Sequence, residues 1–444
     1  MSCPQRISET SEPALHSALN IFSVPPTNVS VQRSYYAEVH PLSAITDQHA
    51  PIQFRLYNDN LWTDMSRIYL HLELSVEKED AARGNWIQLE AADTSWVACV
   101  QSLGLSFIQQ LKVQIGNTDV YDSGTLYHYR SYLANELSFS RAAKESFMAS
   151  CGYRYSKKHD TDTDEGFQER CKLIGGSNIV QLMSRLDFDL GNQELYLLNN
   201  IDALFTIYRA RDAFLIQTLR AADATRYRVF LHSAKLYAKM IDVQPSLNMA
   251  IYGQLEGQAA KYSLRRTEIR STFLTAGRRE VDHNVFAATI PRRLTIAFIK
   301  AAAFNGDFKH SPFNFEPFGI RELSVQAGGQ NYPVAPYNWD FENNKFARAF
   351  IDTYEALGMT NADRTCDITW EQFKSGWTIF VLPLTSTLDD SCGFELLRSG
   401  TTSIHAKFNR PIPVGGVEMI ILGEFDQMIM VDHQRRVLLD SNIG

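Results

Sequence analysis

The chain has 444 residues, of which 45% are hydrophobic and 21% are charged, and its formal net charge is −7. This length exceeds what one hydrophobic core usually serves, so it predicts two domains, and the composition excludes a largely disordered chain. The acidic excess is not typical of a dedicated nucleic-acid-binding protein, which would normally be basic. We find no run of about 18 apolar residues, so we expect no membrane-spanning segment.

Residues 1–34 are predicted to form an N-terminal arm. They are rich in Ser, Thr and Pro, and Pro25 and Pro26 favour an extended path over regular pairing. The arm also carries an apolar pair, Ile21 and Phe22, which needs a surface to be buried against. That surface is either a neighbouring subunit or the body of the same chain, and the sequence leaves both alternatives open.

A long series of strand-like segments follows the arm. Residues 68–76 alternate apolar and polar side chains, and this period of two is a strong strand signal. Helical periodicity is confined to 125–148 and 345–357, so the class is mainly β with one short helical insertion per half. The other predicted strands are 52–56, 111–115, 179–190, 194–208, 213–219, 228–243, 293–300, 320–327, 377–384, 403–409 and 417–432.

The two halves of the chain show a weak internal repeat. The pattern Ile-x-x-Leu-x-Val-x-x-Gly at 108–116 returns at 320–328, and residues 200–205 resemble residues 416–421. The offsets of 212 and 216 are nearly constant, which predicts that one domain occurs twice. Tandem β-domains of this size predict a double jelly-roll, that is, two antiparallel β-sandwiches of about eight strands each. The predicted domains are the arm 1–34, a first jelly-roll 35–222 and a second jelly-roll 223–444, with the boundary near Ala221-Ala222-Asp223.

Several short motifs occur in a characteristic order between about residues 20 and 440. With them the chain resembles the major capsid proteins of Polinton (Maverick) elements, adintoviruses and related virophages. The family usually has Tyr-Ile-Asp-Leu around Asp64, so that Asp is kept here while its flanks differ. The motif residues are Pro25 and Pro26, Asp64, Asn305 and Gly306, Pro312, Phe313, Asn314 and Phe315, and Phe425 and Asp426.

This resemblance implies a structural role. Members of the family form trimers with a pseudo-hexagonal outline, and these trimers tile an icosahedral shell around double-stranded DNA. A separate single jelly-roll penton protein fills the vertices. The resemblance therefore implies a virion capsid location, assembly inside a eukaryotic host cell, no specific DNA binding, no cofactor and no catalytic residue.

Aromatic segments are the candidate contacts between subunits, because Tyr, Trp and Phe are enriched in protein interfaces. Packing inside the chain's own core is the equal alternative for each segment. The candidate interface residues are Ile21 and Phe22 of the arm, Tyr35, Tyr36, Phe318, Tyr337, Trp339 and Phe341.

Two short segments could in principle bind a metal ion. The acidic loop at 159–166 carries Asp160, Asp162 and Asp164, and alternate aspartates can hold calcium. The twelve-residue EF-hand pattern fails here, so we interpret the segment as a mobile, solvent-facing loop. His71-Leu72-Glu73 lacks the second nearby His that a jelly-roll metal site requires, and a solvated or interface pair is the favoured interpretation.

Two other functions stay open at this stage. The first is a host-attachment or carbohydrate-binding protein built from two β-sandwiches, which would not explain the order of the motifs. The second is a transposon-derived copy that no longer assembles, because the same residues would persist in it for a time.

Overall fold

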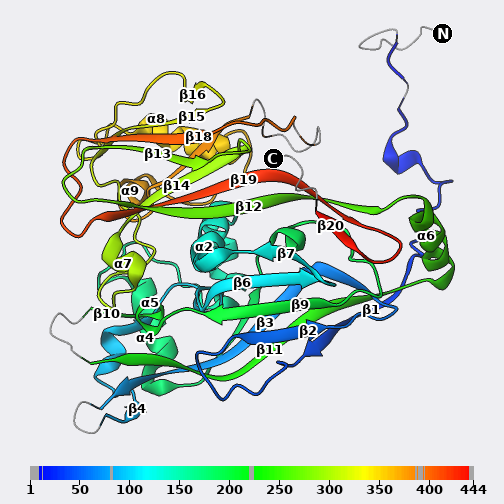
Figure 1. The fold of residues 1–444 in the computed structure, drawn as a ribbon, viewed down its shortest axis with the longest axis horizontal. Coiled ribbons are helices and arrows are strands. Elements are labelled where there is room, and N and C mark those ends of the chain that lie inside the picture. The colour runs from blue at the N-terminus through cyan, green and yellow to red at the C-terminus, as the bar shows by residue number, and fades with distance from the viewer. Residues whose placement is uncertain are drawn as a thin grey trace.

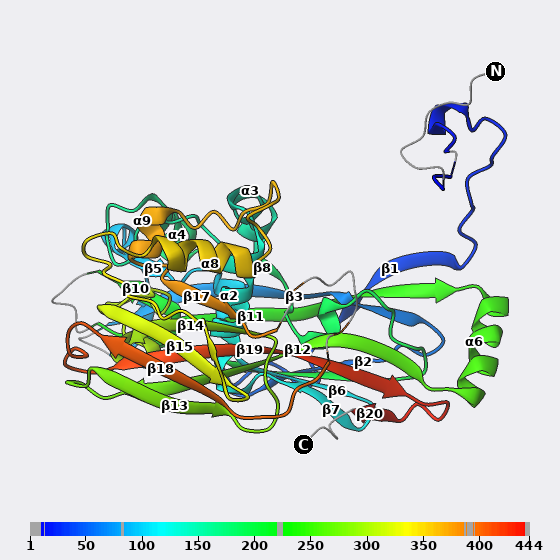
Figure 2. The ribbon, with the colours of Figure 1, turned by 90° about the horizontal axis from the view of Figure 1, so that it is seen from above.

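The computed structural model of the chain describes residues 10–12, 14–80, 84–219, 225–385, 388, 394 and 396–439. Two antiparallel β-sandwiches lie side by side, with helices packed beside them, and the N-terminal arm projects away from the body (Figures 1 and 2). The buried apolar side chains of both sandwiches form one continuous cluster.

The first sandwich combines strands from the start of the chain with a strand from its middle. In β3 the side chains alternate as predicted, since Ile68, Leu70 and Leu72 are fully buried and the residues between them are half-buried. One sheet contains β1 (Val31–Val39), β11 (Tyr227–Val243), β3 (Trp62–Glu79), β8 (Val180–Arg185) and β4 (Trp86–Gln88), of which β8 and β4 both pair with β3. The facing sheet runs β2 (Ile52–Leu56), β9 (Ala203–Arg209), β6 (Ile108–Ile115) and β7 (Thr118–Asp122), and β5 (Val97–Cys99) pairs separately with β10 (Ile216–Thr218).

The second sandwich repeats this order of strands. One sheet runs β12 (Ala260–Leu274), β19 (Val417–Val431), β14 (Arg293–Lys300) and β17 (Ile379–Pro383), with β20 (Val437–Leu439) on β19. The facing sheet runs β13 (Glu280–Phe286), β18 (Thr402–Phe408), β15 (Ile320–Ala327) and β16 (Gln330–Tyr332). Because the Greek-key order is the same in both sandwiches, the fold is a double jelly-roll, as predicted.

One of the two predicted sequence repeats is confirmed. Strands β6 and β15 occupy the same place in their sheets, and each enters a hairpin at a glycine with positive φ, Gly116 (58°) and Gly328 (56°). The other repeat is wrong, because residues 203–205 belong to β9, which corresponds in position to β18 and not to β19. The loops between corresponding strands differ in length, so no single offset holds along the chain.

The predicted domain boundary near residues 221–223 lies outside the described residues. Strand β11 follows it and pairs with both β1 and β3, so a division there would cut a strand out of its own sheet. The hydrogen-bonded sheets change instead at α6 (Pro245–Gly257), between β11 and β12. The arm is also shorter than predicted, because β1 already begins at Val31.

Each jelly-roll carries helices between corresponding strands. The predicted helices at 125–148 and 345–357 are confirmed, and each insertion also contains a helix that was not predicted. Between β7 and β8 lie α2 (Tyr127–Ser138), α3 (Arg141–Glu145), the 3-10 turn η4 (Phe147–Cys151) and α4 (Glu165–Ile174); between β16 and β17 lie α8 (Ala347–Ala356) and α9 (Trp370–Lys374). Three short helices, α1 (Leu103–Ser106), α5 (Asp212–Leu215) and α7 (Ala301–Asn305), lie in other loops.

Candidate functional site: the jelly-roll junction and the exposed arm

An aromatic cluster joins the two jelly-rolls. Helix α2 of the first jelly-roll places the ring of Tyr132 flat on Phe313 of the second, with centroids 3.9 Å apart and planes within 1°. Tyr129, three residues earlier on α2, stacks on Phe304 at 5.4 Å. Since Phe313 and Phe315 are fully buried, the Pro-Phe-Asn-Phe motif fixes the junction.

The side-chain amide of Asn314 in the same motif contacts the acidic loop at 159–166. Asp160 accepts hydrogen bonds from Asn314 Nδ2 (2.8 Å), the Ser311 backbone N–H (2.6 Å) and Gln217 Nε2 (2.6 Å). Its carboxylate therefore joins the acidic loop to β10, which carries Gln217, and to the second jelly-roll, which carries Ser311 and Asn314.

The three aspartates considered as weak candidates for metal ligands do not converge. The buried side chain of Asp164 accepts from the Phe167 N–H at 3.0 Å and so caps the start of α4, while Asp162 is exposed. The interpretation of this segment as a solvent-facing loop was therefore wrong for Asp160 and Asp164. Within the ranges that the structure describes, no three His, Cys, Asp or Glu side chains are grouped as metal ligands.

The Asn-Gly motif allows a close approach at the junction. Gly306 has φ +92°, and a Cβ added there would lie 3.2 Å from the backbone nitrogen of Phe214 in α5 of the first jelly-roll. Only glycine combines this backbone conformation with so little space. Asn305 ends α7 and donates a hydrogen bond from Nδ2 to the Ala301 carbonyl at 2.9 Å.

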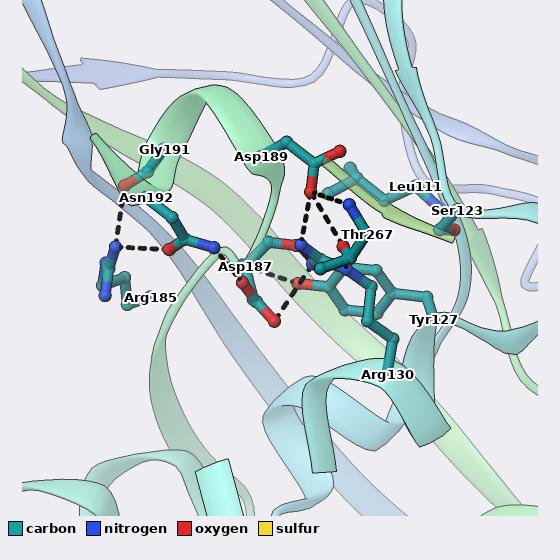
Figure 3. A network of polar contacts seen from close by, with 10 residues as sticks. All are labelled: Leu111, Ser123, Tyr127, Arg130, Arg185, Asp187, Asp189, Gly191, Asn192 and Thr267. Carbon is teal, nitrogen blue, oxygen red and sulfur yellow. Dashed lines mark hydrogen bonds and ion pairs between the residues drawn. The ribbon is translucent and has the colours of Figure 1, made fainter. Parts of the chain in front are cut away.

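A buried polar network crosses the junction beside the aromatic cluster (Figure 3). The guanidinium of Arg130 on α2 pairs with Asp189 Oδ1 at 2.8 Å and with Asp187 Oδ2 at 3.0 Å. Thr267 on β12 of the second jelly-roll donates from its hydroxyl to the same Asp189 oxygen at 2.8 Å. Burial raises the pKa of Asp189, and the Arg130 charge opposes this shift. The sequence does not predict this network, because no local pattern brings these residues together.

The remaining motif residues stabilise single jelly-rolls. Asp64 accepts hydrogen bonds from the backbone and the hydroxyl of Ser66 at 3.1 and 2.6 Å, which stabilises an irregular part of β3. Asp426 forms an ion pair with Arg265 across the β12–β19 ladder, and the ring of Phe425 packs edge-on against Phe286 at 5.1 Å.

The candidate interface residues fall into two groups. Ile21 and Phe22 are 76% and 93% exposed, Pro25 and Pro26 are exposed beside them, and Tyr35 and Tyr36 on the edge strand β1 are exposed as well. Four aromatic candidates follow the other alternative and are buried inside the chain: Phe318, Tyr337, Trp339 and Phe341. Trp339 stacks on Tyr337 and on Phe380 of β17.

A cavity of about 1140 Å³ opens between the loop at 157–160 and the second jelly-roll. Its lining mixes cations with carboxylates, so it presents no single sign of charge to a ligand. His159 lies at its edge against the Trp377 ring at 4.0 Å, and burial lowers the pKa of this His to about 4. His71 and Glu73 lie on the outer face of β3 as predicted, where Glu73 accepts a hydrogen bond from Gln181 at 2.8 Å.

Cys99 and Cys151 are poor nucleophiles. Cys99, Cys151, Cys171 and Cys366 are buried free thiols, and burial raises the pKa of Cys99 and of Cys151 to about 11. A thiol with such a pKa is almost entirely protonated at neutral pH. Separately, no helix in the described part of the chain is long and apolar enough to cross a membrane.

Comparison with known proteins relates this fold to viral capsid proteins. No protein-family model matches the chain. A Caenorhabditis elegans protein described only as uncharacterised is 28% identical over 423 residues, which cover 94% of this chain and 100% of the relative. A structure of the Sputnik virophage superposes with a TM-score of 0.67 at 10% identity and covers 99% of this chain and 95% of the matched chain.

Two viral major capsid proteins also superpose on this chain. The mavirus major capsid protein superposes with a TM-score of 0.56 at 10% identity, covering 99% of this chain and 97% of its own. The Faustovirus major capsid protein superposes with a TM-score of 0.55 at 9% identity, covering 95% of this chain and 93% of its own. Since both likenesses run over nearly the full length of each chain, the whole double jelly-roll is shared and not one sandwich alone.

Proposed function

We propose that the chain is a viral major capsid protein that forms pseudo-hexameric trimers and tiles an icosahedral shell around double-stranded DNA. The observation that carries this proposal is the likeness to major capsid proteins over nearly the whole of both chains. The order of sequence motifs supports a place among the capsid proteins of Polinton elements, adintoviruses and related virophages. In such a shell the partners are further copies of this chain and a single jelly-roll penton protein.

The geometry of the junction supports the same proposal. A trimer of two-domain chains fills a six-fold lattice position only if both domains of a chain keep a fixed relation. Here the aromatic cluster, the Asp160 contacts and the Arg130 network all cross the junction, so three kinds of contact join the two jelly-rolls into one unit. We place this unit in the virion capsid, assembled inside a eukaryotic host cell.

The mass of the purified protein in solution, followed by negative-stain imaging, tests the proposal. A stable trimer of the 50.4 kDa chain with a hexagonal outline, or closed shells, is the expected result. A monomer at every concentration would contradict the assembly. The remaining candidates would then be a host-attachment or carbohydrate-binding double sandwich, which glycan binding would detect, and a transposon-derived copy that no longer assembles.

A further inference from the structure

An apolar groove lies on the outer face of the first jelly-roll, between its five-stranded sheet and η4. We call it the η4 groove; its volume is about 460 Å³. The ring of Phe147 stands at its rim and is 58% exposed. The apolar side chains of the lining include Tyr69, Phe139, Phe147, Met148, Met183 and Leu186.

The charged groups of the groove already have partners inside the chain. Arg185 donates to the carbonyls of Ser66 and Gly191 at 2.8 and 2.7 Å, and Asp187 pairs with Arg130 at 3.0 Å. What is left for a ligand is mainly apolar surface, with the uncharged side chains of Asn135 and Ser138 on α2. This surface extends toward the exposed ring of Tyr36, 6.1 Å from Tyr69. Exposed apolar patches of this kind mark contact sites. The groove therefore suits an uncharged, apolar segment.

The N-terminal arm is such a segment. Residues 14–30 contain no Asp, Glu, Lys or Arg. Their apolar side chains have no cover, since Leu19, Ile21 and Phe22 are all more than half exposed. A segment and a groove that both leave apolar surface in water are complementary, because each gains by burial against the other.

The arm is too short to fill the groove of its own chain. The Ser30 carbonyl accepts a hydrogen bond from the Gln244 N–H at 3.0 Å, so the arm leaves the body at the α6 end. Tyr69 lies two strands away from β1 and level with Glu38. Glu38 is seven residues along β1 from Val31, so the distance from Val31, where the arm begins, to Tyr69 is about 25 Å. Phe22 precedes Ser30 by eight residues, and an extended polyproline-like path of this length also covers about 25 Å. The arm leaves the body at the α6 end and would have to turn back along β1 to reach the groove. No length of chain remains for this reversal of direction.

We propose that Ile21 and Phe22 of one copy dock in the η4 groove of a second copy. The arm would then act as a strap that holds neighbouring chains together, with the Pro25-Pro26 pair as a stiff spacer between the body and the anchor residues. This inference deepens the proposed function, since it names a contact through which the copies associate. It requires contact between copies but not a closed shell.

Disulfide cross-linking between two co-expressed chains tests the docking. Both chains carry Cys3→Ser and Cys392→Ser; one also carries Phe22→Cys, and the other carries an affinity tag and Phe147→Cys. The matched control replaces Phe147→Cys by Phe273→Cys, because Phe273 is 55% exposed on β12 of the second jelly-roll. Since docking raises the effective concentration of the two thiols, mild oxidation should give about tenfold more linked dimer with Phe147→Cys than with Phe273→Cys.

Each outcome decides the inference separately from the proposed function. Equal cross-linking at Phe147 and Phe273 would overturn it, as would a link that forms only within a chain carrying both Phe22→Cys and Phe147→Cys. Trimers or shells without the Phe147 cross-link would leave the capsid proposal standing and reject the docking. A specific cross-link in dimers that never form shells would support the docking and reject the capsid proposal.

Discussion

Two regions of the chain differ in whether their side chains are buried. One is the junction between the two jelly-rolls, and the other is the N-terminal arm. At the junction, charged and aromatic groups from both halves are buried and find partners within one chain, as Arg130 does with Asp187 and Asp189. The arm presents apolar groups such as Phe22 to water, with no Asp, Glu, Lys or Arg among its residues 14–30. The difference teaches that the chain completes its interdomain contact alone and leaves its arm for another molecule.

The largest effect should come from breaking the junction network. Arg130→Met leaves the buried carboxylate of Asp189 and the half-buried one of Asp187 without their cation. Removing one partner of a buried ion pair costs about 3–5 kcal/mol. Urea unfolding of the unchanged protein and of Arg130→Met measures this loss in the free energy of unfolding. Arg33→Met is the control, because the Arg33–Asp242 pair at 2.9 Å lies on the surface, where solvent screens it and little should change. Equal loss in both variants would mean that the network does not hold the halves together.

A smaller loss is expected where the two halves approach most closely. In Gly306→Ala the added Cβ meets the backbone of α5 in an unfavourable conformation, which should cost about 1–3 kcal/mol. Gly277→Ala is the matched control, since Gly277 has φ +84° but no atom within 4 Å of the added Cβ. The thermal midpoint should fall further for Gly306→Ala. The same fall in both would show that the backbone conformation alone, and not the junction, sets the cost.

The pH dependence of stability sharpens the comparison within the junction. His128 on α2 packs against the Phe214 ring at 4.1 Å, and burial lowers its pKa from the usual 6.5 to about 3. As the pH falls below 6.5, the unfolded chain takes up a proton at His128 that the folded chain does not. The free energy of unfolding should therefore fall by about 1.4 kcal/mol for each unit by which the pH drops between those two values.

Unfolding midpoints measured between pH 7.5 and pH 5 check this slope. His128→Phe should reduce it, while His159, whose pKa burial lowers to about 4, continues to contribute in the same direction. An unchanged slope in His128→Phe would mean that other groups account for the acid sensitivity.

The smallest effect on stability is expected in the arm. Phe22→Ser should change the free energy of unfolding by less than about 0.5 kcal/mol, because the side chain makes no core contact. Phe313→Ala, at the fully buried end of the comparison, should cost about 3–5 kcal/mol. Phe22→Ser should instead weaken association, seen as a lower mass in solution at a fixed concentration. A large loss of stability in Phe22→Ser would show that the arm folds onto its own chain.

Much of the architecture could be predicted from local patterns. The alternation in 68–76 and the repeated motif at 108–116 and 320–328 identified strands that are present, and the helices at 125–148 and 345–357 are present too. The domain boundary could not be predicted in this way. Strand β11 belongs to the first jelly-roll only because it pairs with β1 and β3, and pairing between distant strands leaves no periodic signal in the sequence.

The sequence by itself determined the class of fold, its duplication and the apolar character of the arm, because these depend on residue type and spacing along the chain. Only the tertiary structure decided which aromatic residues are buried: Trp339 and Phe341 are covered by the chain, while Tyr36 and Phe22 are not. The same holds for Asp160 and Arg130, whose partners come from the other half of the molecule or from distant loops. Composition can show that a side chain needs a partner, but the packing of remote segments determines which partner it meets.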